Sequence, residues 1–100
     1  MNIFNKITQA NDGKHKYMII LNKNGKTKTI KFGAIGYEHF TSGHLDEARR
    51  QRYVNRHKNN ENFNDETKAG YYAYNYLWRF RTLAEAKKWI YNDLKSKGYN

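Results

Sequence analysis

The Asn-Gly pair within residues 22–25 is the local signal that most restricts how this chain can fold. Both residue types accept the positive φ angles that a two-residue hairpin turn requires. The preceding run, 15–21, carries apolar residues on both faces, which is typical of a strand in the middle of a sheet. The following run, 26–32, alternates and places Ile30 and Phe32 on one face. The pair therefore predicts an antiparallel hairpin.

Turn and cap signals predict the remaining elements. A short run at 4–8 ends before a turn signal at 11–13 and supplies a third strand. Asp46, Thr67 and Thr82 each stand where a helix N-cap is expected, and Thr82 opens a capping box. We therefore expect an α+β fold, a three-stranded antiparallel β-meander followed by three α-helices, in a single domain of residues 1–100. The expected order is a meander at 1–32, a loop with Gly and His at 33–45 and helices at 46–97.

The chain is strongly basic, with 19 Lys and Arg against 9 Asp and Glu and a net charge of +10. Such a charge attracts polyanions, and nucleic acid bound through its phosphate backbone is the simplest partner. Residues 1–32 and 67–100 carry the excess, whereas 33–66 are close to neutral. The residues expected to contact nucleic acid or another anion are Lys26, Lys28, Lys31, Arg79, Arg81, Lys87 and Lys88.

Arg49, Arg52 and Arg56 recur at the spacing of a single helical stripe. One interpretation is a ridge that binds phosphates, because the guanidinium fork matches phosphate oxygens. The other is a structural ion-pair network with acids of the following loop, including Glu61 and Asp65. We favour the network, since this third of the chain is close to neutral.

The helix expected at 67–78 is apolar on both sides. Tyr71, Tyr74 and Trp78 share one side, opposite small residues such as Ala73. Such a helix is packed inside the domain, or its rings contact a partner or stack on bases. We predict that the three rings form a protein interface with another copy or another protein.

No pattern indicates catalysis, a metal or a cofactor. His39, His44 and His57 match no metal-ligand spacing, and the chain has no Cys. The glycines fit neither a phosphate loop nor a dinucleotide fingerprint, and no serine lies in a nucleophile elbow. We expect no enzyme, no cofactor and no small-molecule substrate. The chain also lacks a membrane-spanning apolar run and a signal-peptide core, so we expect neither membrane contact nor secretion.

Several short motifs recur in order from residue 15 to residue 94. They are Phe32-Gly33-Ala34-x-Gly36-Tyr37-x-x-Phe40-Thr41, Asp46-x-x-Arg49-Arg50-x-x-Tyr53-x-x-Arg56-His57, Asn60-Glu61-Asn62-Phe63-Asn64-Asp65, Thr67-x-Ala69-Gly70, Leu77-Trp78 and Thr82-Leu83-x-Glu85-Ala86. This pattern resembles a family of short basic proteins of unassigned function encoded by large DNA viruses, including giant viruses of algae and amoebae. The chain departs from that pattern at Phe63, where Trp is expected, and in the stretches 71–74 and 79–82.

The resemblance implies a viral origin. Together with the aromatic helix, it predicts a non-enzymatic virion structural component, such as a minor capsid or cement protein or an inner-shell protein that faces the genome. Its partners would be other virion proteins or further copies, and its place the virion or the cytoplasm of the infected host cell. The alternative is an accessory protein that binds nucleic acid independently of sequence through its Lys and Arg patches.

Overall fold

The computed structural model describes residues 4–36, 38–58 and 63–99. A three-stranded antiparallel sheet in the order β1-β2-β3 is followed by three α-helices, which confirms the predicted α+β fold in one small domain. The elements are β1 (Ile7–Gln9), β2 (His15–Lys23), β3 (Lys26–Ala34), the π-helical turn η1 (Phe40–His44), α1 (Glu47–His57), α2 (Ala69–Leu77) and α3 (Leu83–Ser96).

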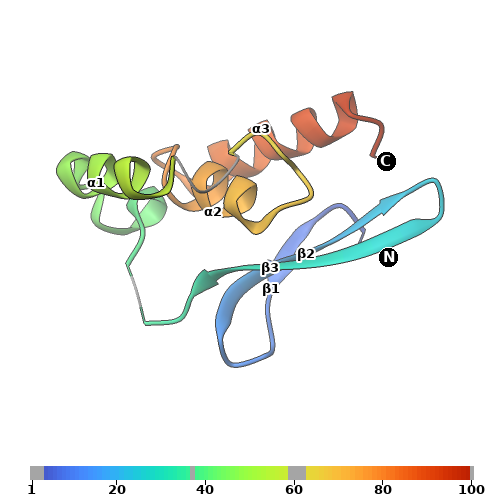
Figure 1. Cartoon of the computed structure of the whole chain (residues 1–100), viewed down its shortest axis with the longest axis horizontal. Coiled ribbons are helices and arrows are strands. Elements are labelled where there is room, and N and C mark those ends of the chain that lie inside the picture. The colour runs from blue at the N-terminus through green and yellow to red at the C-terminus, as the bar shows by residue number, and fades with distance from the viewer. Residues whose placement is uncertain (1–3, 37, 59–62, 100) are drawn as a thin grey trace.

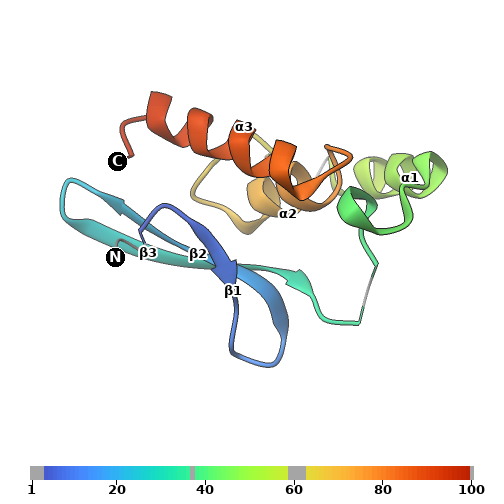
Figure 2. The ribbon, with the colours of Figure 1, turned by 180° about the vertical axis from the view of Figure 1, so that it is seen from behind.

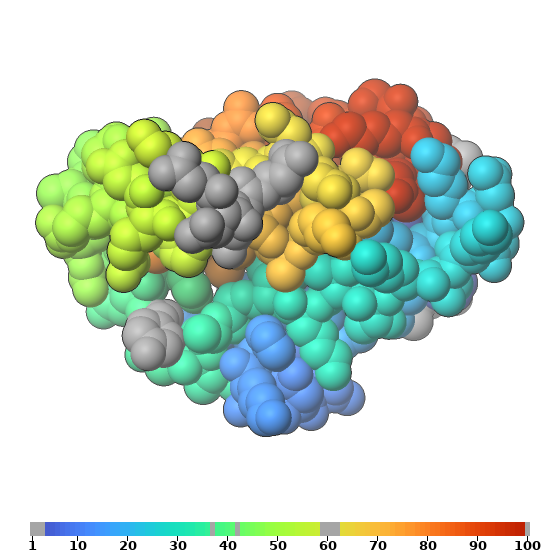
Figure 3. All heavy atoms as spheres, viewed as in Figure 1, coloured from blue at the N-terminus to red at the C-terminus, as the bar shows by residue number. Residues whose placement is uncertain are grey.

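The helices lie on one side of the sheet, and α1 extends beyond the end of the sheet that lies opposite the β2–β3 turn (Figures 1 and 2). The molecule measures 41 × 27 × 25 Å, and Figure 3 shows the α1 region and the β2–β3 hairpin at its two ends. Within the described ranges, none of the helices has the length and apolar character needed to cross a bilayer.

The β2–β3 hairpin forms as predicted. Lys23 pairs with Lys26, which leaves Asn24 and Gly25 as the two turn residues. Their φ angles are 55° and 80°, the positive values that the mirror-image turn requires. β1 is shorter than expected and begins at Ile7. It occupies one edge of the sheet, where it pairs with β2.

Two of the three predicted helix caps are present. The carboxylate of Asp46 accepts hydrogen bonds from the backbone N–H groups of Ala48 and Arg49. The Thr82 hydroxyl accepts a bond from the Glu85 N–H at 3.2 Å, which makes the predicted N-cap, and donates one to the Glu85 Oε1 at 3.0 Å.

The third predicted cap, at Thr67, is wrong. α2 begins at Ala69, and its N-cap Lys68 makes no side-chain capping bond. Thr67 instead donates its N–H and its hydroxyl to the Asp65 Oδ1, at 2.9 and 2.6 Å. The Asp65 carboxylate is a strong acceptor, and its bond with the Thr67 hydroxyl holds that side chain in the turn before α2.

The core is built around α2. Tyr71, Tyr72, Tyr76 and Leu77 are at most 2 % exposed. The Tyr76 ring meets the Phe32 ring of β3 edge-on at 5.9 Å. α3 covers α2 from the other side with buried residues of its own, Ala86, Ile90 and Leu94. α2 thus lies between the sheet and α3, which explains why its sequence is apolar on both sides.

The three aromatic residues predicted to form an interface are packed within the domain. Tyr71 is buried, Tyr74 stacks on Phe63 at 4.4 Å, and Trp78 stacks on Tyr53 at 4.4 Å with the planes only 7° apart. These contacts correspond to the alternative in which the helix packs inside the domain. Contact with another chain stays a prediction, and these residues provide no exposed aromatic patch that would favour it.

Replacing Trp78 with Ala should therefore lower the free energy of unfolding by about 3–5 kcal/mol, because a large ring leaves a packed stack. Ile35, which is 51 % exposed, provides the control. Ile35→Ala should change the free energy by no more than about 0.5 kcal/mol. Urea denaturation measures both values, and a Trp78→Ala protein as stable as the control would contradict the packing described above.

Candidate functional site

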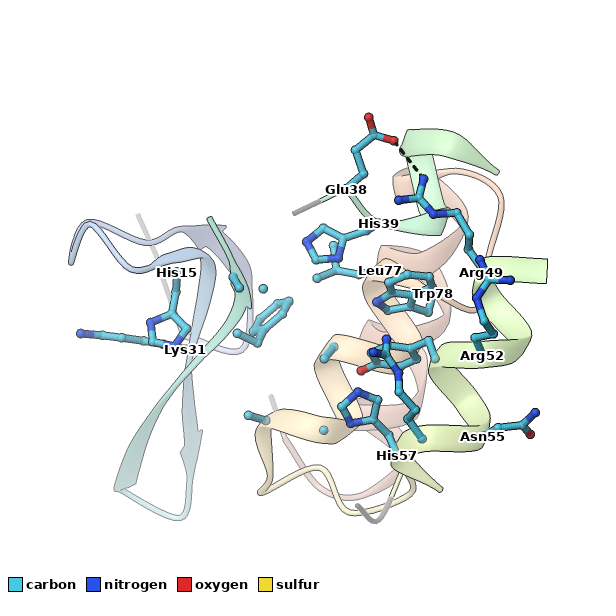
Figure 4. Close-up of a pocket in the computed structure, with 18 residues that line it drawn as sticks. His15, Lys31, Glu38, His39, Arg49, Arg52, Asn55, His57, Leu77 and Trp78 are labelled. Atoms are coloured by element: carbon cyan, nitrogen blue, oxygen red, sulfur yellow. Dashed lines mark ion pairs between the residues drawn. The ribbon is translucent and has the colours of Figure 1, made fainter. Parts of the chain in front are cut away.

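A cleft of about 850 Å³ opens between α1 and the sheet. Residues of β2, β3, the segment 38–39, α1 and α2 line it, and Figure 4 shows them. α2 contributes Ala69, Gly70 and Ala73, whose small side chains leave room that larger ones would fill. The small residues on the side of α2 away from its predicted aromatic interface therefore line an open space.

One face of α1 forms a wall of the cleft. Arg49, Arg52, Tyr53, Arg56 and His57 all line it, as their spacing on one helical face allows. The Tyr53 ring stacks on Trp78 of the α2 C-terminus and so attaches this wall to the core. The three arginines lie on one face of α1, as predicted, and this face lines the cleft.

The three arginines of this wall have few carboxylate partners. Arg49 lies 3.7 Å from Glu38, and both side chains are largely exposed, so this pair contributes little to stability. Arg52 and Arg56 are exposed, and no carboxylate among the described residues pairs with either.

The ion-pair network expected between the stripe and the following loop is not found among the described residues. Asp65 accepts hydrogen bonds from Thr67, and hydrogen bonding by Thr67 keeps the pKa of the Asp65 carboxyl below its usual value. Glu61 lies outside the described residues. Because Arg52 and Arg56 have no carboxylate partner in the described part of the chain, the structure favours the other interpretation, a ridge that can bind phosphates.

The opposite wall carries His15 and Lys31. Both lie near Asp12, at 2.7 and 3.6 Å from its Oδ2. Hydrogen bonds from the His15 side chain and from backbone N–H groups hold the pKa of Asp12 well below its usual range. In Figure 4 the Lys31 side chain extends away from α1. The positive charge beside the cleft thus comes chiefly from α1.

His39 lies at one end of the cleft, edge-on to Trp78 with ring centres 5.9 Å apart. Neither ring nitrogen has a hydrogen-bond partner among the described residues. Burial, together with the charges of Lys16 and His44, lowers the pKa of His39 to about 4. The imidazole is therefore neutral at pH 7.

The other residues expected to bind anions are not gathered at this site. Lys26 and Lys28 are exposed on β3 and do not line the cleft, whereas Lys31 of the same strand does. Arg81, Lys87 and Lys88 lie on the helical side of the molecule, where Lys87 is half-buried.

Arg79 is held by contacts within the domain. Its guanidinium lies 4.3 Å from the Trp89 ring centre and 4.9 Å from that of Phe80. It also donates a hydrogen bond to the Asn75 Oδ1 at 3.1 Å. Binding an anion would compete with these contacts, so Arg79 is a weaker candidate than the exposed lysines.

Most of the other lining residues, among them His15, Glu38 and His39, were not selected as site residues from the sequence. Only the tertiary fold brings the start of β2 and the segment 38–39 next to α1. The position of Glu38 and His39 just before η1 and α1 gave no spacing pattern that could reveal this.

Residues 5–57 match the model of a family of unknown function, DUF5754. The chain belongs to this family. The matched range contains the sheet, η1 and α1, and so both facing walls of the cleft, but it ends before α2. Comparison with curated proteins and with solved structures gives no match. The family description states no function, and the viral origin of the chain stays a prediction.

Arg52→Ala and Arg56→Ala should each change the free energy of unfolding by no more than about 0.5 kcal/mol, because both side chains are exposed and unpaired among the described residues. Arg50 of the same helix is the matched control. Its guanidinium lies 4.9 Å from the Phe40 ring and donates to the Arg79 carbonyl. Urea denaturation should show that Arg50→Ala destabilises the fold more than Arg52→Ala or Arg56→Ala. The reverse order would mean that the stripe has a structural role.

His39 should make the protein less stable as the pH is lowered. The unfolded imidazole binds a proton below about pH 6.5, whereas the folded one does so only near pH 4. The fold therefore loses stability as pH falls through this window and gains nothing further above it. From pH 7 to pH 5 the wild type should lose about 1–2 kcal/mol more than His39→Phe in urea denaturation. Equal losses would contradict a buried neutral His39.

Proposed function

We propose that the protein is a non-catalytic nucleic-acid-binding protein that holds the phosphate backbone on the arginine face of α1. The observation that carries this proposal is the cleft wall of Arg49, Arg52 and Arg56, with Glu38 as the one carboxylate among the described lining residues. Arginine binds phosphate oxygens with two parallel hydrogen bonds, and such contacts fix backbone rather than sequence.

The dimensions of the stripe suit a polymer. Seven residues separate Arg49 from Arg56, which spans about 10 Å along a helix axis. Over that distance duplex DNA carries about three phosphates on each strand. The net charge of +10 and the exposed lysines of β3 extend the positive field beyond the cleft. A backbone bound at α1 would therefore meet further cations outside the site.

A place inside a virus particle, next to the genome, is consistent with this binding and still rests on the resemblance described above. The aromatic residues that were expected to contact another chain have partners within the domain. The nucleic-acid-binding alternative is therefore the better supported of the two functions.

Replacing Arg52 and Arg56 together with Ala should weaken binding to a duplex and reduce its salt dependence. Each lost phosphate contact lowers the slope of log K against log salt by about 0.9, so two lost contacts lower it by about 1.8. The matched control is Lys6→Ala with Lys95→Ala, two exposed residues outside the cleft. That pair removes the same charge and should change the slope far less. Fluorescence anisotropy at several salt concentrations measures both.

Two outcomes contradict the proposal. Equal losses for the arginine and lysine pairs would mean that net charge, not the cleft, binds the nucleic acid. An absence of binding to single-stranded and duplex DNA at low salt would remove the nucleic-acid partner altogether.

A further inference from the structure

We infer that the cleft receives an unpaired base, so that the preferred partner is single-stranded nucleic acid. This inference rests on the proposed function, because the arginine face must hold the backbone from which the base enters. It adds a second contact of different chemistry, which a phosphate-binding ridge does not require.

The size and lining of the cleft carry this step. Its volume of about 850 Å³ falls within the roughly 300–1,000 Å³ of pockets that enclose a drug-sized organic molecule. Ala69, Ala73, Leu77 and Trp78 of α2 contribute apolar surface, and Phe32 of β3 faces the same space. Apolar walls do not stabilise a bound phosphate, whereas they can pack against the flat faces of a base.

The charged and apolar surfaces adjoin each other as they do in a nucleotide. Arg52 and Arg56 lie on the same wall as the Tyr53 ring, which continues into Trp78 through the stack. The His57 ring lies 4.3 Å from Tyr53 and lines the cleft as well. The faces of Tyr53 are covered by Trp78 and His57, so a strand with its phosphates on the arginines can turn a base toward the ring edges and the apolar side chains of α2.

A duplex cannot make both contacts, because its bases are paired and stacked inside. One base would have to leave the stack, which costs a few kcal/mol. A free mononucleotide could enter, but it would occupy only part of an arginine face that spans about 10 Å. The polymer uses the whole face and the surrounding charge, so we assign the cleft to a single strand.

Trp78 provides a direct reporter of base entry. The chain has two tryptophans, and Trp89 packs on Phe80 and Arg79 and does not line the cleft. In the Trp89→Phe protein the fluorescence therefore reports Trp78 alone. It should be titrated with oligo-dT, with an abasic strand of the same length, with a duplex of that length and with thymidine monophosphate, after circular dichroism has shown that the variant is folded.

Oligo-dT should quench the fluorescence of Trp78 and bind at least about 10-fold more tightly than the abasic strand, a factor within the range for one base that contacts aromatic side chains. The abasic strand and the duplex should bind through phosphates without quenching. Equal affinity of the intact and abasic strands without quenching would overturn the base site and leave the proposed function standing. Binding of none of the polymers would overturn the proposed function itself. If thymidine monophosphate binds as tightly as oligo-dT, the single-strand assignment is overturned and the ligand is a free nucleotide.

Variants that fill the cleft test base binding separately from phosphate binding. Ala69 is exposed at the start of α2 and lines the cleft, so Ala69→Phe should narrow the cleft without unfolding the protein. It should reduce the preference for the intact over the abasic strand to less than about 3-fold while duplex binding is kept. Ala84→Phe, at an exposed position of α3 outside the cleft, is the matched control and should keep the preference. Ala73→Leu repeats the test deeper in the cleft. An undiminished preference in both cleft variants would overturn the proposal.

Discussion

The stack of Tyr53 on Trp78 joins α1 to the core. The two rings are nearly parallel, 4.4 Å apart, and both are buried, so they join α1 to the end of the helix that forms the core. α1 otherwise extends beyond the end of the sheet (Figure 1). The same contact holds the arginine wall at a fixed position opposite β3, with the cleft between them. The position of the cleft wall and part of the stability of the fold thus share one aromatic pair.

The central position of α2 follows from its composition. Tyrosines on several sides of the helix bury large rings, and their hydroxyls find partners at the edge of the core, as Tyr71 does with Asp93 at 2.6 Å and Tyr72 with the Glu66 carbonyl at 2.8 Å. A small chain thereby gains a substantial core from amphipathic residues. The small residues at one face of α2 leave the cleft open instead of filling it.

Local chemistry made much of the fold predictable. The Asn-Gly turn, the Asp46 cap and the Thr82 cap depend on neighbouring residues only, and each forms as expected. The Thr67 cap failed because a second acceptor, Asp65, lies two residues away. Residues of the site were harder to assign. The stripe of Arg49, Arg52 and Arg56 was visible in the sequence, but spacing along one helix does not show which side chains of other elements the stripe faces.

The arginines of α1 also show why spacing alone could not separate structural from binding residues. Arg50 differs from Arg49 by one position, yet its guanidinium packs on Phe40 and donates to a carbonyl beyond α2. A turn of 100° per residue is enough to move a side chain from the interior side of a helix to its cleft side. On the cleft side, Arg52 and Arg56 are exposed beside apolar walls and have no carboxylate partner in the described part of the chain. Exposed cations beside a cleft contribute little to folding, and under the proposed function an anionic ligand with an apolar part would account for both the charge and the apolar walls.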